Sequence, residues 1–341
     1  MDDVARFTAG DRRDLFTETA ARRRSLGPAI VEKDFWVCWT LRRCFGLDDP
    51  PASLIFKGGT SLSKVYGLID RFSEDVDLSF NRSDLGFAGE QDPATAPSRK
   101  QARLRVEELA DVCRSVLSDD FMPKLSEAFS KELGERDWKL ELDPDDPDGQ
   151  TLLFEYPPGV EGQEEPYVHP VVRLEFGARS DHWPAEAGSV TPYAAEVFGD
   201  QFQDAETEVL VLAAERTFWE KATILHAWHH APAEKTFRDR QSRHYYDVVM
   251  LWHSDVRTKA MEQIELLEAV AKHKNVFFAS AWAKYDEARR GTLRLLPPEH
   301  LRMRLKEDYE RMQEMFFEEP PGFDSLLERL AEIEAVVNEK S

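Results

Sequence analysis

One short stretch, residues 53–80, constrains the fold of this chain more than any other. It reads SLIFKGGTSLSKVYGLIDRFSEDVDLSF. The apolar run at 53–56 predicts a short strand that ends at a Gly-Gly turn, and SLSKVYGLI then resumes the spacing of a helix. The segment 75–80, DVDLSF, alternates strictly between polar and apolar side chains, as a strand with one buried face does. The order strand, turn, helix and strand within so few residues predicts a mixed α and β structure here.

The alternating strand places two carboxylates on one face. Asp75 and Asp77 point the same way and can share a hard divalent cation such as Mg²⁺ or Mn²⁺. Glu175 lies on the polar side of another predicted strand, 170–177, and is a candidate third ligand. Such ions neutralise a nucleoside triphosphate (NTP) and polarise its α-phosphorus. Taken alone, however, Asp-x-Asp is equally the pattern of charges on the wet face of a strand.

The Gly-Gly turn offers a place for phosphate oxygens. Without side chains at Gly58 and Gly59, backbone amides can approach a phosphate closely, and Thr60 and Ser61 add hydroxyls at the start of the following helix. The same four residues are also a common turn and helix cap.

The rest of the chain predicts an α+β fold in two parts. Residues 1–205 form a domain with N-terminal helices, a small mixed sheet and a β-hairpin around PDDPDGQ. Residues 206–341 form an all-helical C-terminal domain. In it, EVLVLAAERTFWEKATILHAWHH at 208–230 is expected to be one long helix.

The composition limits where the protein works and what it touches. The 341 residues are 42% hydrophobic, and no run of about 18 apolar residues predicts a membrane span. Three cysteines without paired spacing predict a reducing, cytoplasmic setting and no disulfide framework. The formal charge of −21 predicts that any nucleic acid is contacted through a limited basic strip.

The order of these motifs resembles the polymerase-β-like nucleotidyltransferase superfamily and, more narrowly, the AbiEii/AbiGii toxin family of type IV toxin–antitoxin systems. Members carry a glycine and a small residue, a leucine three residues on, and then Arg-x-Thr-x-Asp-x-Asp. The corresponding residues here are Gly58, Gly59, Leu62, Arg71, Ser73, Asp75 and Asp77. Glycine at 59 replaces the usual serine, and serine at 73 replaces the usual threonine.

The resemblance extends over nearly the whole chain, from IVEKDFWV near the start to LKEDYERMQEMF near the end. It implies a catalytic lysine in ERTFWEK, Lys221, that contacts the triphosphate. It also implies a helix, SRHYYDVVML, in which Asp247 orients Lys221 or the acceptor. The residues then expected to contact the nucleotide are Gly58, Gly59, Thr60, Ser61, Lys64, Arg71, Ser73 and Arg243.

The resemblance implies a magnesium-dependent nucleotidyltransferase that takes an NTP as substrate and is the toxin of a two-gene system used in phage defence. A cognate antitoxin is then the expected partner, and the 3′ end of tRNA is one expected acceptor. A small molecule or a protein is the alternative acceptor.

Simpler interpretations stand beside these. Arg243 and Asp247 are spaced as a surface ion pair on a helix. The histidines of HAWHH share a helix face and could hold zinc, but no glutamate and no fourth ligand accompany them in the sequence. Trp36, Trp39 and the Phe218-Trp219 pair are interpreted as core residues and not as base-stacking platforms.

Overall fold

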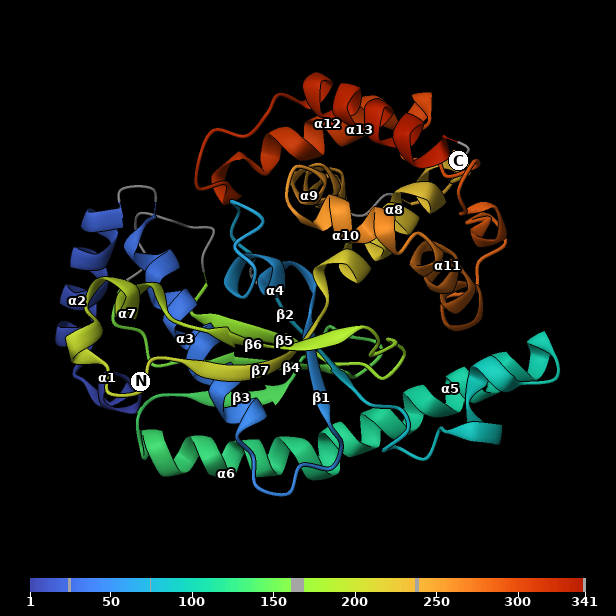
Figure 1. Ribbon diagram of the computed structural model, residues 1–341. Helices are drawn as coiled ribbons and strands as arrows, with labels where there is room; N and C mark the ends of the chain where they lie inside the picture. Colours follow the sequence, from blue (N-terminus) through green and yellow to red (C-terminus); the bar gives the residue numbers. More distant parts are fainter. Residues whose placement is uncertain (24–25, 74, 161–168, 237–238, 340–341) are drawn as a thin grey trace. The chain divides into compact units, whose positions relative to one another are not determined.

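The computed structural model describes residues 1–23, 26–73, 75–160, 169–236 and 239–339. The chain divides into two compact units, drawn in Figure 1. The first unit contains residues 1–65, 72–88 and 107–211, and the second contains residues 66–71, 89–106 and 212–341. Mixed sheet and helices in the first unit and helices in the second confirm the α+β prediction. The second unit differs from the linear division at 205/206 because it includes two earlier segments.

The first unit is built on a seven-stranded sheet with the order β3-β4-β5-β2-β1-β7-β6. The strands are β1 (Leu54–Lys57), β2 (Asp75–Phe80), β3 (Lys139–Leu142), β4 (Thr151–Glu155), β5 (Val171–Glu175), β6 (Ala185–Val190) and β7 (Thr207–Leu212). The central β2 runs antiparallel to β1 and parallel to β5, and β1 runs parallel to β7. The predicted hairpin is β3 and β4, which pair antiparallel.

The described helices of the first unit are α1 (Asp2–Arg6), α2 (Ala9–Arg23), α3 (Pro28–Phe45), α4 (Gly58–Lys64), α6 (Met122–Leu133) and α7 (Tyr193–Val197). A π-helical turn, Leu117–Phe121, precedes α6. The helix α5 (Arg99–Val116) carries the chain from the segment 89–106 into this unit. A short 3₁₀ turn, Gly199–Gln201, follows α7.

The apolar face of the sheet packs against α3 and α6. Rings from both helices meet Phe154 of β4: the ring centroids of Phe129 and Phe154 are 4.5 Å apart, and those of Trp39 and Phe154 are 5.8 Å apart. Trp36 and Trp39 are fully buried, which confirms that they are core residues. Because this face is filled with rings, the polar side chains of β2 must lie on the opposite face.

The prediction of one helix over 208–230 is wrong at its start. Residues Thr207–Leu212 form the strand β7, and the helix α8 begins at Ala214. Val209 and Val211 are buried while Glu208 and Leu210 are exposed, which is the alternation of a strand. A short apolar run fits either structure, and here pairing with β1 decides for the strand.

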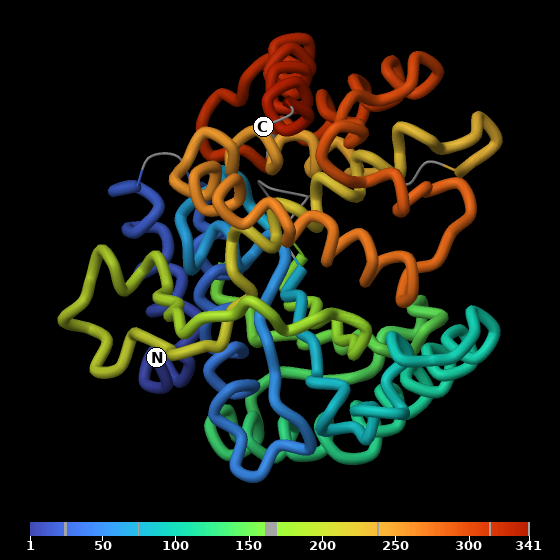
Figure 2. The backbone as a smooth tube through the Cα atoms, turned by 45° about the vertical axis from the view of Figure 1, so that its right-hand side comes forward, coloured from blue at the N-terminus to red at the C-terminus, as the bar shows by residue number. Residues whose placement is uncertain are grey.

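The second unit is made of helices: α8 (Ala214–His229), α9 (Ser242–Trp252), α10 (Val256–Glu262), α11 (Glu265–Phe277), α12 (Glu299–Arg311) and α13 (Phe323–Asn338). Short 3₁₀ turns lie at Gly89–Gln91, Pro93–Thr95, Tyr285–Glu287 and Gln313–Met315. The helices α8 and α9 pack on each other, and α10, α11, α12 and α13 pack on one or both of them. Figure 2 follows these helices as the yellow-to-red part of the tube. Phe218 and Trp219 of α8 are buried in this unit, as predicted.

The segment 66–71 is held within the helical unit. The Tyr66 hydroxyl donates to the carbonyl of Leu212 (3.1 Å), and the amide of Phe317 donates to the carbonyl of Asp70 (3.0 Å). Arg71 also forms an isolated antiparallel bridge with Phe316. Among the described residues, no helix is both long and apolar enough to cross a membrane.

Candidate active site

The polar face of the sheet gathers the predicted carboxylates. Asp77 of β2 lies beside Glu175 of β5 and, on its other side, beside Lys57 of β1. Asp75 lies beside Arg173 of β5. Side chains at paired positions of neighbouring strands point to the same face. The structure therefore brings Asp75, Asp77 and Glu175 to one surface, on adjacent strands.

The glycine turn fits closely around Asp77. Gly58 has a φ of +82°, a conformation that residues with a side chain rarely adopt. A Cβ atom built on it would lie 1.9 Å from Oδ2 of Asp77. Glycine at this position therefore lets α4 begin directly against the carboxylate.

The hydroxyls of the turn are used internally. Thr60 is buried, and its Oγ1 donates to the carbonyl of Asp75 (2.5 Å), while the Ser61 hydroxyl donates to the carbonyl of Gly58 (3.0 Å). Gly59 and Ser73 are buried as well. These contacts fix α4 to the start of β2 and give Thr60 and Ser61 a positioning role in the turn; their contact with phosphate stays a prediction.

Lys64 is also directed away from the carboxylates of β2. Its ammonium lies 2.6 Å from Oδ1 of Asp34 and 3.6 Å from the ring centroid of Tyr193. The side chains of both Lys64 and Asp34 are almost fully buried, at 5% and 3% exposed. Lys64 thus anchors the end of α4 to α3, and this placement does not support the predicted contact with the nucleotide.

Two residues of this face were missed from the sequence as members of the site. Nη1 of Arg173 lies 2.5 Å from Oδ2 of Asp143, and Nε lies 3.1 Å from Oε1 of Glu175 and 4.0 Å from Oδ1 of Asp75. The pattern of β5 showed that Arg173 and Glu175 share a face. Asp143 could not be placed from sequence, because its position depends on the register of the hairpin.

The electrostatics of the face favour a cation. Burial raises the pKa of Glu175, and the negative charges of Asp75 and Asp77 raise it further, while Arg173 opposes them. Lys57 lies 3.6 Å from Asp77. Counted together with Asp143, four carboxylates face two cations, so these six residues carry two negative charges in excess. A divalent cation would balance that excess. In the described part of the chain, no three Asp, Glu, His or Cys side chains are arranged, as they stand, so that together they could hold a metal ion.

The helical unit holds a second cluster around Asp247, which is fully buried. Arg71 binds it through two contacts, Nε to Oδ1 (2.8 Å) and Nη2 to Oδ2 (2.7 Å), and the Lys221 ammonium lies 2.8 Å from Oδ2. Although burial opposes ionisation, the two cations hold the pKa of Asp247 well below its usual range. The interpretation of Arg243 and Asp247 as a surface ion pair is therefore wrong.

In this cluster, the surroundings of Lys221 disfavour its charged form. Burial lowers the pKa of Lys221, and Arg71 and Arg243 add to the effect while Asp247 opposes it. Two cations share one carboxylate, so the group of Arg71, Lys221 and Asp247 carries one positive charge in excess. Such a group is suited to an anion.

A model of the family described as nucleotidyl transferase AbiEii toxin, type IV TA system, matches residues 39–329. This range covers most of the chain and every predicted site residue. The chain belongs to the AbiEii family. It is therefore a nucleotidyltransferase of the toxin type, as the motifs predicted.

A solved structure supports the fold of this AbiEii protein. The chain is similar to MenT4, a nucleotidyltransferase toxin from Mycobacterium tuberculosis H37Rv, with a TM-score of 0.52 and 17% sequence identity. The similarity covers 96% of this chain and 90% of that one. No curated protein matches the chain in sequence.

His226 and His229, in the HAWHH segment of the AbiEii protein, are held by the backbone. His226 accepts a hydrogen bond at Nδ1 from the amide of Arg294 (3.0 Å), and its Nε2 lies 3.1 Å from the carbonyl of Lys284. Burial lowers its pKa to about 4. His229 places Nδ1 2.7 Å from the carbonyl of Leu296. Both ring nitrogens of His226 are thus engaged by the backbone, and zinc is not needed to explain this cluster.

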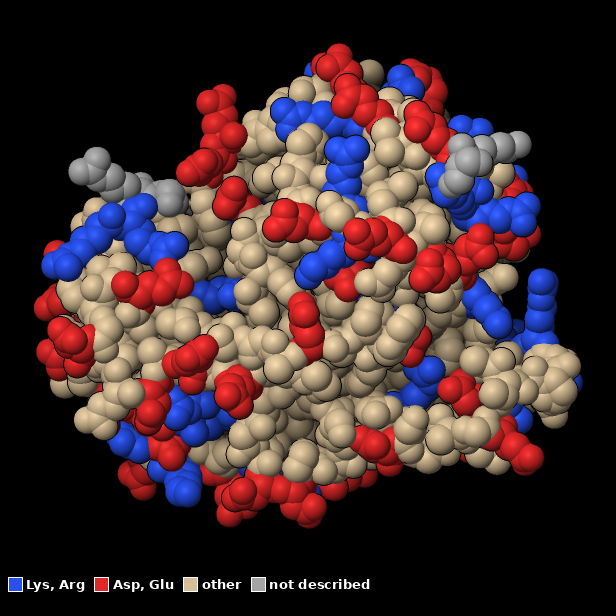
Figure 3. All heavy atoms as spheres, viewed as in Figure 1, with Lys and Arg blue, Asp and Glu red and all other residues tan. Residues whose placement is uncertain are grey.

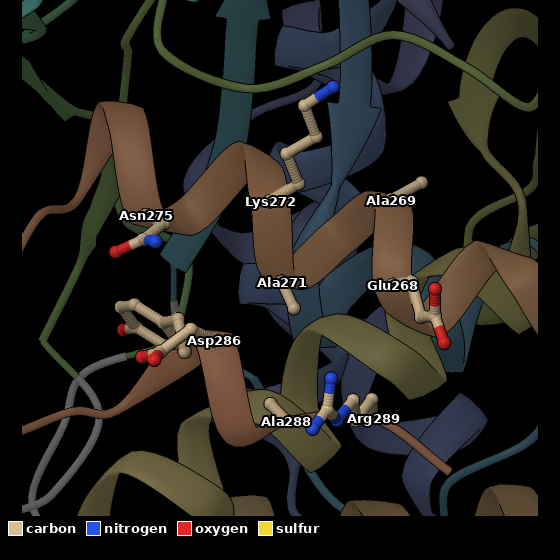
Figure 4. A pocket seen from close by; sticks show the side chains of 9 residues that line it. Glu268, Ala269, Ala271, Lys272, Asn275, Asp286, Ala288 and Arg289 are labelled. Atoms are coloured by element: carbon tan, nitrogen blue, oxygen red, sulfur yellow. The ribbon is translucent and has the colours of Figure 1, made fainter.

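Other surface features of the AbiEii protein carry no predicted site residue. A hollow of about 410 Å³ lies between α11 and the segment 285–289, and Figure 4 shows side chains of both signs around it, including Glu268, Lys272 and Arg289. Figure 3 shows acidic and basic side chains interspersed over the face that it draws. All three cysteines, Cys38, Cys44 and Cys113, are buried thiols.

Proposed function

We propose that this protein transfers a nucleotide from an NTP to an acceptor such as the 3′ end of tRNA, with Mg²⁺ or Mn²⁺ as cofactor. The observation that carries the proposal is the polar face of the sheet, where Asp75, Asp77 and Glu175 lie on adjacent strands. Counted with Asp143, Lys57 and Arg173, this face has two negative charges in excess. Hard divalent cations prefer carboxylate oxygens in such a setting.

Asp75 and Asp77 would hold the cation, with Glu175 as a third ligand. The donor set fits, because all three groups are oxygen ligands on adjacent strands, and Gly58 leaves room that a Cβ would fill. When bound, the cation would neutralise the triphosphate and polarise its α-phosphorus. Thr60 keeps the start of β2 in place through its bond to the backbone of Asp75.

Lys221 is proposed to contact the triphosphate, and Asp247 to orient Lys221. The excess positive charge of their cluster supports this role, because a polyphosphate carries several negative charges. Arg71, which is fully engaged with Asp247, is proposed to fix the carboxylate and thereby the lysine. Arg243, one helical turn from Asp247, contributes further positive charge to the same group.

The net charge of the protein limits how a tRNA acceptor could bind. With a net charge of −21, the surface repels a nucleic acid over most of its area, so contact with tRNA would involve few phosphates. We expect a salt slope of about −0.7 to −0.9 per phosphate neutralised. Unpaired nucleotides at the tRNA end would then supply specificity. A small molecule or a protein is the alternative acceptor.

The family description adds a partner. A type IV toxin–antitoxin family implies a cognate antitoxin. We propose that this protein works in the cytoplasm, in phage defence, and that the antitoxin neutralises it there.

The deciding experiment incubates the full chain with each of four radiolabelled NTPs, Mg²⁺, and tRNA, protein or small-molecule acceptors. Asp77→Asn should abolish label transfer. Asp14→Asn is the matched control, because it makes the same change of charge at a side chain that is 83% exposed. Full transfer by Asp77→Asn, or transfer by the wild type that chelation leaves unchanged, would refute the proposal. Label on a small molecule or protein alone would establish the alternative acceptor.

A further inference from the structure

The side chain of Arg173 lies among the carboxylates of Asp75 and Glu175, which the proposed function assigns to metal binding. It extends from β5 between two residues assigned to the metal, with its Nε nearer to Glu175 (3.1 Å) than to Asp75 (4.0 Å). Its side chain is 39% exposed, so it is not a buried core pair. Holding an exposed arginine in one geometry costs side-chain entropy. Strong contacts with its partners are therefore needed to keep it in place.

Asp143 supplies that fixation. Its side chain is 4% exposed, and its Oδ2 lies 2.5 Å from Nη1 of Arg173. Asp143 is itself held at both ends: its amide donates to the carbonyl of Thr151 (2.9 Å), and its Oδ1 accepts from the amide of Asp145 (2.9 Å). The guanidinium is therefore clamped from behind by a rigid turn and directed at Glu175 and Asp75.

We propose that Arg173 is a positioning residue that acts as a fixed cation in place of a second metal ion. By binding Oε1 of Glu175 and facing Oδ1 of Asp75, it takes the place of a second ion between these two carboxylates. The acidic face then binds one divalent cation tightly, at Asp75 and Asp77, with the other oxygen of Glu175 as the third ligand. This inference rests on the proposed function, because it assigns the metal content of that same site.

The alternative is that Arg173 merely stabilises the sheet, as other arginines of this unit do. Arg179 offers the comparison: its Nη2 lies 3.9 Å from Asp148, and it is 32% exposed. A structural role would make the removal of either arginine change stability without changing metal content. A positioning role makes only the removal of Arg173 change it.

The test counts bound Mn²⁺ by the electron paramagnetic resonance signal of the free ion, on the full chain. We expect one tight site in the wild type and in Arg179→Gln. In Arg173→Gln we expect a second ion and a first ion bound about tenfold more tightly, because a nearby positive charge no longer repels it. Arg173→Lys keeps the charge and should keep one ion. Asp143→Asn should admit the second ion weakly, because Arg173 is no longer clamped.

Circular dichroism melting of each variant verifies that it is folded. Two equally tight ions in the wild type, or the same count in folded Arg173→Gln and wild type, would overturn the inference. Nucleotidyl transfer by the wild type, measured in parallel, tests the proposed function separately. If the wild type binds Mn²⁺ without transferring label, the function fails while the ion count still decides the role of Arg173. If it binds no Mn²⁺, both fail.

Discussion

Replacing Gly58 by alanine should damage the site far more than it damages the fold. The new Cβ would lie 1.9 Å from Oδ2 and 2.7 Å from Cγ of Asp77, so the carboxylate has to leave its position. The backbone itself also resists, because a residue with a side chain at a φ of +82° is strained by roughly 1–2 kcal/mol. The backbone strain should lower the free energy of unfolding, and the displacement of the Asp77 carboxylate should weaken metal binding.

Gly86→Ala separates the two effects. Gly86 has a φ of +90°, and nothing lies within 4 Å of its hypothetical Cβ. Its alanine variant should therefore lose about 1–2 kcal/mol of unfolding free energy and keep its activity. Gly58→Ala should lose that amount and about 1–3 kcal/mol more for the forced movement of Asp77. Its transfer rate should fall about 100-fold or more, because losing one ligand removes several kcal/mol of charge stabilisation.

The assay combines urea denaturation, Mn²⁺ binding and label transfer on both variants at one pH. Full Mn²⁺ affinity and transfer in Gly58→Ala, equal to those of Gly86→Ala, would show that the close approach of Gly58 to Asp77 is not part of the site.

Three further predictions concern the helical unit. Asp247→Ala should cost about 3–5 kcal/mol in urea denaturation, because Arg71 and Lys221 lose the carboxylate they share; a double variant with Lys221→Met should recover part of it, and no recovery would contradict the shared-anion description. Lys221→Ala should weaken triphosphate binding and turnover, with Lys221→Arg only partly restoring them; unchanged kinetics in the alanine variant would remove Lys221 from the site. Burial lowers the pKa of His226 to about 4 in the folded chain, against about 6.5 unfolded, so its stabilising contribution is complete above about pH 6.5 and is lost as the pH falls towards 4, by up to about 3 kcal/mol. His226→Asn should flatten this part of the denaturation profile, and an identical pH dependence in variant and wild type would contradict the assignment.

The sequence pattern predicted the strand at 75–80 correctly but not the strand at 207–212. The alternation in 75–80 gave the strand and the shared face of Asp75 and Asp77, since side-chain direction depends only on the backbone period. The segment 207–212 was mispredicted, because its six residues fit a helix or a strand, and the decision came from a parallel partner some 150 residues earlier in the chain.

The candidate site shows the same division. The spacing of Gly58, Asp75 and Asp77, read together with the family resemblance, made them candidates, and the structure places Gly58 directly against Asp77. The ion pairs of Lys64 with Asp34 and of Arg173 with Asp143 join residues 30 apart in the sequence, so no local pattern could reveal which charge each lysine or arginine faces. Long cations near a glycine turn look like phosphate contacts in a sequence, and only tertiary structure shows that a carboxylate already holds them.

The placement of residues 66–71 within the helical unit has a consequence for synthesis on the ribosome. These residues emerge early, yet their partners are Leu212, Asp247, Phe316 and Phe317, which are translated up to about 250 residues later. The segment that leads into β2 therefore cannot reach its final contacts until nearly the whole chain has left the exit tunnel. A chain that terminates before residue 316 therefore lacks the backbone partners of Asp70 and Arg71.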